Sequence, residues 1–390
     1  MLIKKIAFIH INFPCGGAEK ITTHISDELV KIGYQIYLFA EKIEADKLCL
    51  KDKSIILQQT PTSVYSRESA DFIIDQINKN QIDLFICPGL VLNYLPRIRK
   101  ETNCKVVYSH HSMPFWEITA KITAGEHASH KSLGKRIEWL LFRAPKYKLP
   151  HYLKKKVYNS YKLRYDEVDS YTVLCEAYAQ EICRKIGIER GKSKITVLTN
   201  PIMNPPTEIK EKKKQLVFVG RLTFADKRVD RLLYIWQKLY QQHPDWSLLI
   251  YGDGEEKENL IRLSQQLNLK RVEFMGYQTN TTQIYEHASV LCMTSSYEGW
   301  PLVLTEAQAH GVIPIAFNCC AGIEEIISPD NKYGFLIKPF DTAEYVKALQ
   351  SIMSDPALLK SMQSRVIESA NRYTVEQVTK QWLSFLKSFE

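Results

Sequence analysis

Two glutamates stand eight positions apart in the stretch SYEGWPLVLTEAQAHG. Glu298 falls in a Gly/Pro turn after an apolar segment typical of a strand, and Glu306 falls in an apolar run typical of a helix. Across such a turn both carboxylates can face one ligand, and carboxylates accept hydrogen bonds from pairs of hydroxyl groups well. The pair predicts a site for a ligand that carries one sugar near the turn and a ribose deeper in.

Two cations, Arg221 and Lys227, follow another apolar segment in the stretch FVGRLTFADKR. A guanidinium fork and an ammonium group suit the two phosphates of a diphosphate, whose departing charge they would neutralise. A solvated pair of surface cations is the ordinary alternative. A glycosidase, in which two carboxylates flank one bond, is the rival reading of the glutamates. In a glycosidase, however, phosphate-binding cations would be idle.

A pair of glycines follows the first apolar segment of the chain, in the stretch PCGGAEK. Gly16 and Gly17 would let backbone N–H groups approach a phosphate at the start of a helix. An ordinary strand-to-helix turn, with Glu19 in the first helical turn, is the alternative. The stretch lacks the G-x-G-x-x-G pattern, which argues against a nicotinamide cofactor and leaves little support for Glu41 as a ribose ligand.

The chain contains no D-x-D sequence, the usual carboxylate motif of transferases that hold a diphosphate through a metal ion. Arg221, Lys227 and helix dipoles could replace such an ion, so we predict no metal and no cofactor. The nine cysteines form no C-x-x-C pair and no zinc-binding spacing with histidine. We expect them to be reduced and mostly buried.

Apolar segments with strand patterns alternate with segments of helical periodicity along the whole chain. This rhythm predicts parallel sheets with helices on both faces, whose ligands bind beyond the carboxyl ends of the strands. Residues 200–214, NPIMNPPTEIKEKKK, combine three prolines with a run of charges and predict a linker. The rhythm restarts after it, so we expect two Rossmann-like units of similar size. A final amphipathic helix would bury Val378, Trp382, Phe385 and Leu386.

The length of the chain agrees with a division into two units, because 390 residues are too many for one ordinary core. A hydrophobic share of 45% and a charged share of 24% are typical of a soluble globular protein. No apolar run reaches the roughly 20 residues of a membrane helix. The start, MLIKKIAFIHINF, has a short apolar stretch and no cleavage site, so we interpret it as a buried strand and expect a cytoplasmic protein.

Residues 131–165 concentrate the positive charge of the protein. Eleven lysines and arginines face one glutamate there, whereas the whole chain carries a net charge of +9. Tyrosines, Trp139 and Phe142 are interleaved with the cations. This composition predicts association with an anionic membrane surface. A solvated helix face and a nucleic-acid patch are the alternatives, and we expect no nucleic acid.

The order of these motifs resembles the retaining glycosyltransferases of the GT-B fold, family 4 (glycosyl transferases group 1). The resemblance covers nearly the whole chain and rests on the stretches GGAEK, HSMP, TNP, VGRL, YGDGEE, the two glutamates and YGFLIKPFD. It implies an α/β protein of two facing Rossmann-like domains with a central cleft. We expect an acceptor-binding domain at 1–203, a nucleotide-sugar-binding domain at 204–370, and a helix at 371–390 that crosses back to the first domain.

The resemblance also implies roles for individual residues. Arg221 and Lys227 would clamp the diphosphate, Glu298 would bind the donor sugar, and Glu306 would bind the ribose. His111 would lie beside the transferred sugar; a second histidine, His110, precedes it, and His111 is favoured because a small polar residue and a proline follow. The catalytic set is thus His111, Glu298, Arg221 and Lys227. The implied donor site adds Gly16, Gly17, Tyr277, Gly299, Trp300, Pro301, Leu302, Val303 and Glu306.

The implied reaction moves a sugar from a nucleoside diphosphate donor, with retention at the anomeric carbon, to a lipid-linked or polysaccharide acceptor. The stretch from Glu298 to Ile327 favours uridine diphosphate hexoses or N-acetylhexosamines as donors. A nucleotide-sugar epimerase of the same architecture is one alternative, but the basic aromatic segment argues against it because an epimerase needs no second substrate. A non-catalytic sugar-nucleotide binding protein is the other.

Overall fold

The computed structural model describes residues 3–14, 16–44, 55–129, 133–143, 151–203, 205–327 and 332–390 of the 390-residue chain. The chain divides into two compact units. Unit 1 consists of Met1–Pro114, Lys156–Met203 and Thr374–Glu390, and unit 2 consists of Phe115–Lys155 and Asn204–Tyr373. Each unit contains a parallel sheet, as the alternating sequence pattern predicts.

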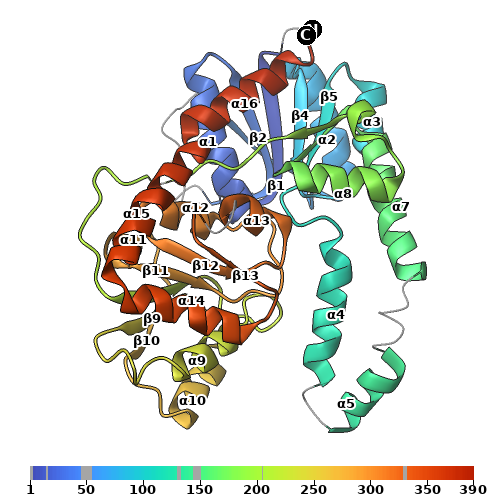
Figure 1. The fold of residues 1–390 in the computed structure, drawn as a ribbon. Helices are drawn as coiled ribbons and strands as arrows, with labels where there is room; N and C mark the ends of the chain where they lie inside the picture. The colour runs from blue at the N-terminus through green and yellow to red at the C-terminus, as the bar shows by residue number, and fades with distance from the viewer. Residues whose placement is uncertain are drawn as a thin grey trace. The chain divides into compact units, whose positions relative to one another are not determined.

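Unit 1 is built, within the described residues, on a seven-stranded sheet in which all paired strands are parallel (Figure 1). The strand order β3-β2-β1-β4-β5-β6-β7 reverses between β1 and β4. Strand β4 is buried along its whole length, as expected for a parallel sheet covered on both faces. The strands are β1 Lys5–Phe13, β2 Gln35–Ile43, β3 Ile55–Gln59, β4 Leu84–Pro88, β5 Lys105–Ser109, β6 Ser170–Val173 and β7 Ile195–Val197.

The helices of unit 1 bury one apolar face each. In α1 the buried face includes Ile21, Ile25 and Leu29. The helix ends at Lys31, and Ile32 is half exposed at its C-cap. The helices are α1 Gly17–Lys31, α2 Arg67–Asn80, α3 Leu95–Glu101, α7 His151–Glu167, α8 Glu176–Ile186 and α16 Val375–Lys387, with a 3₁₀ turn at Arg190–Lys192; residues 151–155 of α7 belong to unit 2.

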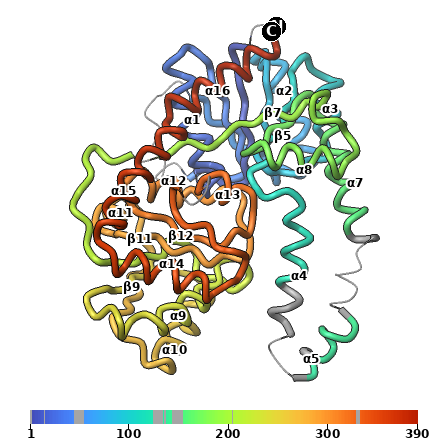
Figure 2. Tube along the Cα trace, in the orientation of Figure 1, coloured from blue at the N-terminus to red at the C-terminus, as the bar shows by residue number. Residues whose placement is uncertain are grey.

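The last helix, α16, lies beside α1 although nearly the whole chain separates them in sequence (Figure 2). Its apolar residues Val378, Trp382, Phe385 and Leu386 are all buried. The Trp382 ring packs 6.2 Å from the ring of Phe8 in β1, measured between centroids. The side-chain oxygen of Gln381 accepts hydrogen bonds from the backbone N–H (3.2 Å) and hydroxyl (3.0 Å) of Thr199. The C-terminal helix is therefore part of unit 1.

Unit 2 contains a six-stranded parallel sheet in the order β10-β9-β8-β11-β12-β13, counted over the described residues. Trp236 of α9 and Trp246 are fully buried in its core with the apolar residues of β8, β9 and β12. The strands are β8 Gln215–Val219, β9 Ser247–Tyr251, β10 Val272–Gly276, β11 Val290–Met293, β12 Ile313–Phe317 and β13 Phe335–Ile337. The helices are α9 Val229–Gln237, α10 Lys257–Gln266, α11 Thr282–His287, α12 Leu302–Ala309, α13 Ala321–Ile327, α14 Thr342–Ser354 and α15 Pro356–Ala370, followed by a 3₁₀ turn at Asn371–Tyr373.

Three helical pieces between β5 and α7 pack on one another: α4 Trp116–Ser129, α5 Leu133–Glu138 and a π-helical turn at Trp139–Arg143. They carry part of the predicted basic segment 131–165, of which residues 131–132 and 144–150 lie outside the described residues. In the described parts of the chain, no helix combines the length and the apolar character that a membrane span requires.

The cysteines agree with the expectation of buried thiols wherever the structure describes them. Cys319 is half-buried and the others in the described ranges are buried: Cys87, Cys104, Cys175, Cys183, Cys292 and Cys320. Cys15 and Cys49 lie outside the described residues.

Candidate active site

The strand order of unit 2 brings two loops together. The order reverses between the neighbouring strands β8 and β11, and ligands of open α/β sheets bind beyond the carboxyl ends of the strands at this reversal. The loop after β8 carries Arg221 and Lys227, and the loop after β11 carries Glu298. Three of the predicted site residues thus lie in the two loops where the topology places a ligand.

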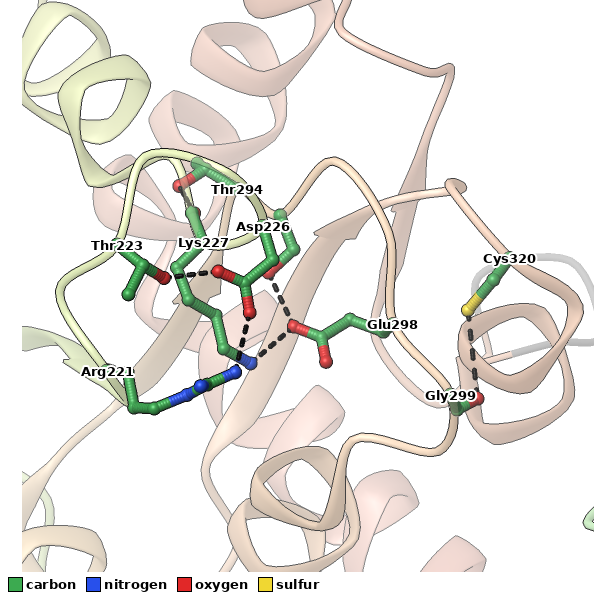
Figure 3. A network of polar contacts seen from close by, with 9 residues as sticks. Arg221, Thr223, Asp226, Lys227, Thr294, Glu298, Gly299 and Cys320 are labelled. Atoms are coloured by element: carbon green, nitrogen blue, oxygen red, sulfur yellow. Dashed lines mark hydrogen bonds and ion pairs between the residues drawn. The ribbon is translucent and has the colours of Figure 1, made fainter. Parts of the chain in front are cut away.

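Lys227 and Glu298 form an ion pair across these loops. The Nζ atom of Lys227 lies 2.6 Å from Oε1 of Glu298, and the hydroxyl of Ser295 donates to the same oxygen at 2.6 Å. Figure 3 shows the Glu298 carboxylate pointing toward the end of the Lys227 side chain. Burial alone would lower the pKa of Lys227, but the Glu298 carboxylate raises it above its ordinary value. The Glu298 carboxylate therefore favours the protonated form of Lys227.

Arg221 is held by one nitrogen of its guanidinium, while most of its side chain is exposed. Its Nη2 atom donates to Oδ2 of Asp226 at 3.0 Å, while 74% of the Arg221 side chain is exposed. The Thr223 hydroxyl donates to the other carboxylate oxygen of Asp226. The backbone carbonyl of Asp226 accepts from the N–H of Ser296 at 2.6 Å, which joins the two loops. The guanidinium is thus oriented yet free to contact an anion (Figure 3).

Two glycines of the YGDGEE stretch fix the loop that carries Arg221. A Cβ at Gly252 would collide with the carbonyl of Gly220, and one at Gly254 would collide with the backbone of Leu222. Because neither glycine has a Cβ, the loop after β9 lies directly against the loop after β8. The Leu222 N–H donates to the carbonyl of Asp253 at 2.8 Å. Backbone contacts therefore set the position of Arg221.

Arg228, next to Lys227, makes its contacts with nearby residues of its own chain segment. It adopts a left-handed conformation (φ 51°) as the N-cap of α9. Its Nε and Nη2 atoms donate to the two carboxylate oxygens of Asp230 at 3.0 and 2.9 Å, and its guanidinium lies 4.1 Å from the centroid of the Phe224 ring. Of these neighbouring cations, Arg221 and Lys227 have the geometry for an external ligand, and Arg228 stabilises the loop.

The predicted backbone stretch from Gly299 to Val303 leads into helix α12. Pro301 is the N-cap, so Leu302 and Val303 form the first turn and present the N–H end of the helix dipole. Trp300 is buried and packs edge-on against Tyr373, with ring centroids 5.3 Å apart. The thiol of Cys320 approaches the carbonyl of Gly299 at 3.9 Å. The contacts of Tyr373 and Cys320 therefore hold the loop that connects Glu298 to α12.

Glu306 and Tyr277 have different surroundings from the Lys227 pair. Glu306 is buried in α12, and its charge adds to burial in raising the pKa of Tyr285 well above the ordinary range. Tyr277 follows the edge strand β10 and is two-thirds exposed. The described contacts therefore join Arg221, Lys227 and Glu298, with Asp226, into one region, while Glu306 lies beside Tyr285.

In unit 1, the two histidines after β5 have contrasting environments. His110 is buried with its ring 5.4 Å from the Tyr161 ring, and burial, with the charge of Arg164, lowers its pKa to about 3. His111 is only partly buried, and its Nε2 atom lies 3.1 Å from the hydroxyl of Ser109. His110 thus belongs to the core, and His111 is the more exposed of the two histidines.

The glycine turn after β1 surrounds an acidic side chain. The carboxylate of Glu19 occupies the space where a Cβ would stand at Gly16, whereas Gly17 has open space there. Oε1 of Glu19 lies 3.5 Å from Nδ1 of the buried His10, whose Nε2 lies 3.0 Å from the Thr22 hydroxyl. Gly16 thus makes room for a carboxylate of its own chain.

Asp226 and Ser295 are the residues of this region that sequence reasoning missed. Asp226 stands directly before Lys227, and an acid beside two cations predicted to bind phosphate is a signal that could have indicated a positioning role. Ser295 contacts Glu298 three positions away, which a turn allows but does not require. Within the described residues, no cluster of three or more metal-ligating side chains is found.

Two parallel α/β sheets, and a cation–carboxylate site at the strand reversal of the second one, define a GT-B type of enzyme. Residues 200–372 match the family model described as glycosyl transferases group 1. With this match over residues 200–372 and with the relatives and structures described next, the chain is a glycosyltransferase with the GT-B fold, as the resemblance implies.

Two of three similar proteins match nearly the whole chain, and the third matches less than half of it. An uncharacterized glycosyltransferase from Haemophilus influenzae is 27% identical over 399 residues, covering 98% of this chain and 100% of that protein. A lipopolysaccharide 1,6-galactosyltransferase from Escherichia coli is 32% identical over 179 residues, covering 43% of this chain and 49% of that protein. The crystal structure of HepE from Anabaena in complex with UDP matches with a TM-score of 0.73 at 15% identity, covering 99% of this chain and 100% of HepE.

Proposed function

We propose that the protein transfers a sugar from a UDP-hexose or UDP-N-acetylhexosamine to a lipid-linked or polysaccharide acceptor, with retention, in the synthesis of a cell-surface glycan. The contact between Lys227 and Glu298, beside the exposed guanidinium of Arg221, is the observation that carries this proposal. Two cations and a carboxylate that lie close together suit a diphosphate joined to a sugar, which supports the proposal. The UDP complex of HepE and the lipopolysaccharide galactosyltransferase support the classes of donor and acceptor.

In this reaction the bond between the anomeric carbon and the diphosphate oxygen breaks, and a bond from that carbon to an acceptor oxygen forms. Arg221 and Lys227 neutralise the departing diphosphate, which receives the proton of the acceptor hydroxyl. The N–H end of α12 adds a fixed partial positive charge. Glu298 accepts hydrogen bonds from donor-sugar hydroxyls, and Glu306 from the ribose. We name no enzymatic nucleophile.

Divalent metal ions are expected to be unnecessary for transfer, because the cationic side chains already balance the diphosphate charge. Activity should be the same after treatment with a chelator and after addition of Mg²⁺. A requirement for Mg²⁺ or Mn²⁺ would contradict this part of the proposal.

The decisive experiment incubates the full chain with UDP-glucose, UDP-galactose, UDP-N-acetylglucosamine and UDP-N-acetylgalactosamine, with and without lipid-linked glycan acceptors. Release of UDP that increases with acceptor, and a product whose anomeric configuration matches the donor, are expected. Conversion of the donor to an epimer without acceptor would establish the epimerase instead. Binding of UDP without turnover of any donor or acceptor would indicate a non-catalytic sugar-nucleotide binding protein and would overturn the proposal.

We further propose that the π-helical turn and the end of α5 dock on an anionic membrane. Ile137, Leu140, Leu141 and Phe142 are 50%, 58%, 63% and 63% exposed. Successive residues of a helical turn point in different directions, so one neighbouring helix cannot cover 140–142 together. These four exposed apolar residues lie in a stretch, residues 131 to 164, that carries eleven cations and one acid. Apolar insertion flanked by positive charge suits an interface of anionic lipids.

Vesicle sedimentation tests this docking. The wild-type chain should bind vesicles with phosphatidylglycerol better than vesicles of phosphatidylcholine alone, and less well when salt is raised. The triple variant Leu140→Ser, Leu141→Ser, Phe142→Ser should bind at least tenfold more weakly, since each buried apolar side chain contributes about 1.5 kcal/mol or more. The double variant Ile209→Ser, Tyr234→Ser, at exposed apolar positions elsewhere, is the matched control. Equal binding by the triple variant and wild type would refute the docking surface.

A further inference from the structure

Two hydroxyl groups lie next to each other on neighbouring strands of unit 1. Ser109 of β5 and Thr172 of β6 are partners in the parallel register. The hydroxyl of Thr172 donates a hydrogen bond to Oγ of Ser109 at 2.8 Å. Both residues are more than nine-tenths buried, so their hydroxyl protons need partners inside the protein.

The Ser109 hydroxyl also contacts His111. Its Oγ atom lies 3.1 Å from Nε2 of the His111 ring. Because the Ser109 oxygen already receives the proton of Thr172, its own proton points to a different acceptor, and Nε2 is the acceptor within reach. A proton on Nε2 would leave the buried Ser109 hydroxyl without an acceptor, which costs about 1 to 3 kcal/mol.

We propose that Thr172 and Ser109 are positioning residues that hold His111 in its neutral form with the proton on Nδ1, so that the Nδ1–H group donates to the transferred sugar. The protonation of Nδ1 follows from the hydroxyl pair alone. The contact with the sugar rests on the proposed function and on the resemblance to family 4 glycosyltransferases, which implies that His111 lies beside the transferred sugar.

The charges around His111 agree with a neutral ring. Burial, together with the neighbouring His10 of β1, lowers the pKa of His111 to about 4, and the Glu19 carboxylate of α1 opposes this change only in part. The ring is therefore neutral at pH 7, where one nitrogen carries a proton and the other does not. The hydrogen bond from Ser109 decides which of the two nitrogens carries the proton.

The tautomer assigns His111 a specific chemical role. With Nε2 occupied by Ser109, the ring has no free acceptor nitrogen, so it cannot take the proton of the acceptor hydroxyl. The remaining Nδ1–H is a hydrogen-bond donor that can orient an oxygen of the sugar. His111 thus acts by orientation, and proton removal is left to the departing diphosphate.

Long-range ¹H–¹⁵N correlation spectra of the histidine-labelled full chain test the tautomer directly, with the His111 signals assigned from their loss in His111→Gln. We expect a protonated Nδ1 and an unprotonated Nε2 in the wild type at pH 7.5. In Ser109→Ala the signals should shift toward a mixture of tautomers. Thr172→Val should shift them less, because Ser109 is retained. A protonated Nε2 in the wild type would overturn the proposal whether or not the chain transfers sugar.

Kinetics with the best UDP-sugar test the positioning role. Ser109→Ala should reduce kcat about tenfold with the donor KM nearly unchanged, the cost of one misplaced hydrogen bond. Ser109→Thr, which keeps a hydroxyl, should recover most of the rate. Ser170→Ala is the matched control. Ser170 is also a buried serine and lies in β6, the strand of Thr172, but its hydroxyl donates to the carbonyl of Lys194 (3.2 Å) and does not contact His111. Equal losses of kcat in Ser109→Ala and Ser170→Ala would mean a merely structural role.

Discussion

The Nζ atom of Lys227 and the Oε1 atom of Glu298 lie 2.6 Å apart, and 71 positions of sequence separate the two residues. Only 17% and 12% of the two side chains is exposed, so each charge depends on the other in the free protein. A bound diphosphate would share Lys227 with Glu298. Under the proposed function, the carboxylate would stay oriented toward the sugar while the ammonium contacts phosphate, which would link the two halves of the donor.

Removal of either partner should abolish transfer and destabilise unit 2. Lys227→Ala leaves a largely buried carboxylate without its cation, and we expect the free energy of unfolding to fall by roughly 2 to 4 kcal/mol. Glu298→Ala should cost a similar amount. Urea denaturation and turnover of the best UDP-sugar measure both effects. Near-normal turnover in both variants, once each is shown to be folded, would discard the assignment of this pair to the donor site.

Asp226→Asn should weaken donor binding without removing a group that touches the donor. The neutral amide holds Arg221 less strongly than the carboxylate does at 3.0 Å. We expect the Kd for UDP, measured by titration calorimetry, to rise about tenfold, the effect of one charge-assisted hydrogen bond. Asp230→Asn breaks the pair with Arg228 in the same loop and is the matched control. An equal effect of both variants would show that loop stability alone is responsible.

Stability should fall as the pH is lowered from 8 to 5 because a histidine is buried in its neutral form. The pKa of His110 is lowered to about 3 by burial and by the charge of Arg164. The unfolded chain binds this proton below about pH 6.5, whereas the folded chain does not. Stability is therefore complete above pH 6.5 and is lost progressively below it, by about 2 kcal/mol at pH 5 from this residue. Urea denaturation of the wild type and His110→Phe at both pH values should give a smaller pH effect in the variant. Identical pH effects would contradict the prediction.

Trp382→Ala should destabilise unit 1, because it removes a buried indole that packs on Phe8. Large-to-small changes of this kind cost about 3 to 5 kcal/mol. Thermal unfolding of the variant should begin at a lower temperature than that of the wild type, while Lys380→Ala, at an exposed position of the same helix, should unfold like the wild type. An unchanged melting curve for Trp382→Ala would mean that α16 contributes little to unit 1.

The sequence by itself determined the local elements and the edge of the sheet where the site lies. The apolar segments of β1, β8 and β11 and the periodicity of α1 and α16 are one-dimensional patterns, and they predict two parallel α/β sheets. Because the carboxyl ends of parallel strands meet at one edge, the residues after β8 and β11 could be placed near a common ligand. Strand β3, IILQQ, which ends in two polar glutamines, and the three-residue strand β13 were not predicted.

The tertiary structure decided which side chains meet. Strand order makes β8 and β11 neighbours, and only then does Lys227 reach Glu298. Register places Ser109 opposite Thr172 and so selects the partner of His111, while the core encloses His110. Such contacts depend on packing between segments far apart in sequence. A periodic pattern records which face of an element is apolar and carries no information about the neighbour that will cover it.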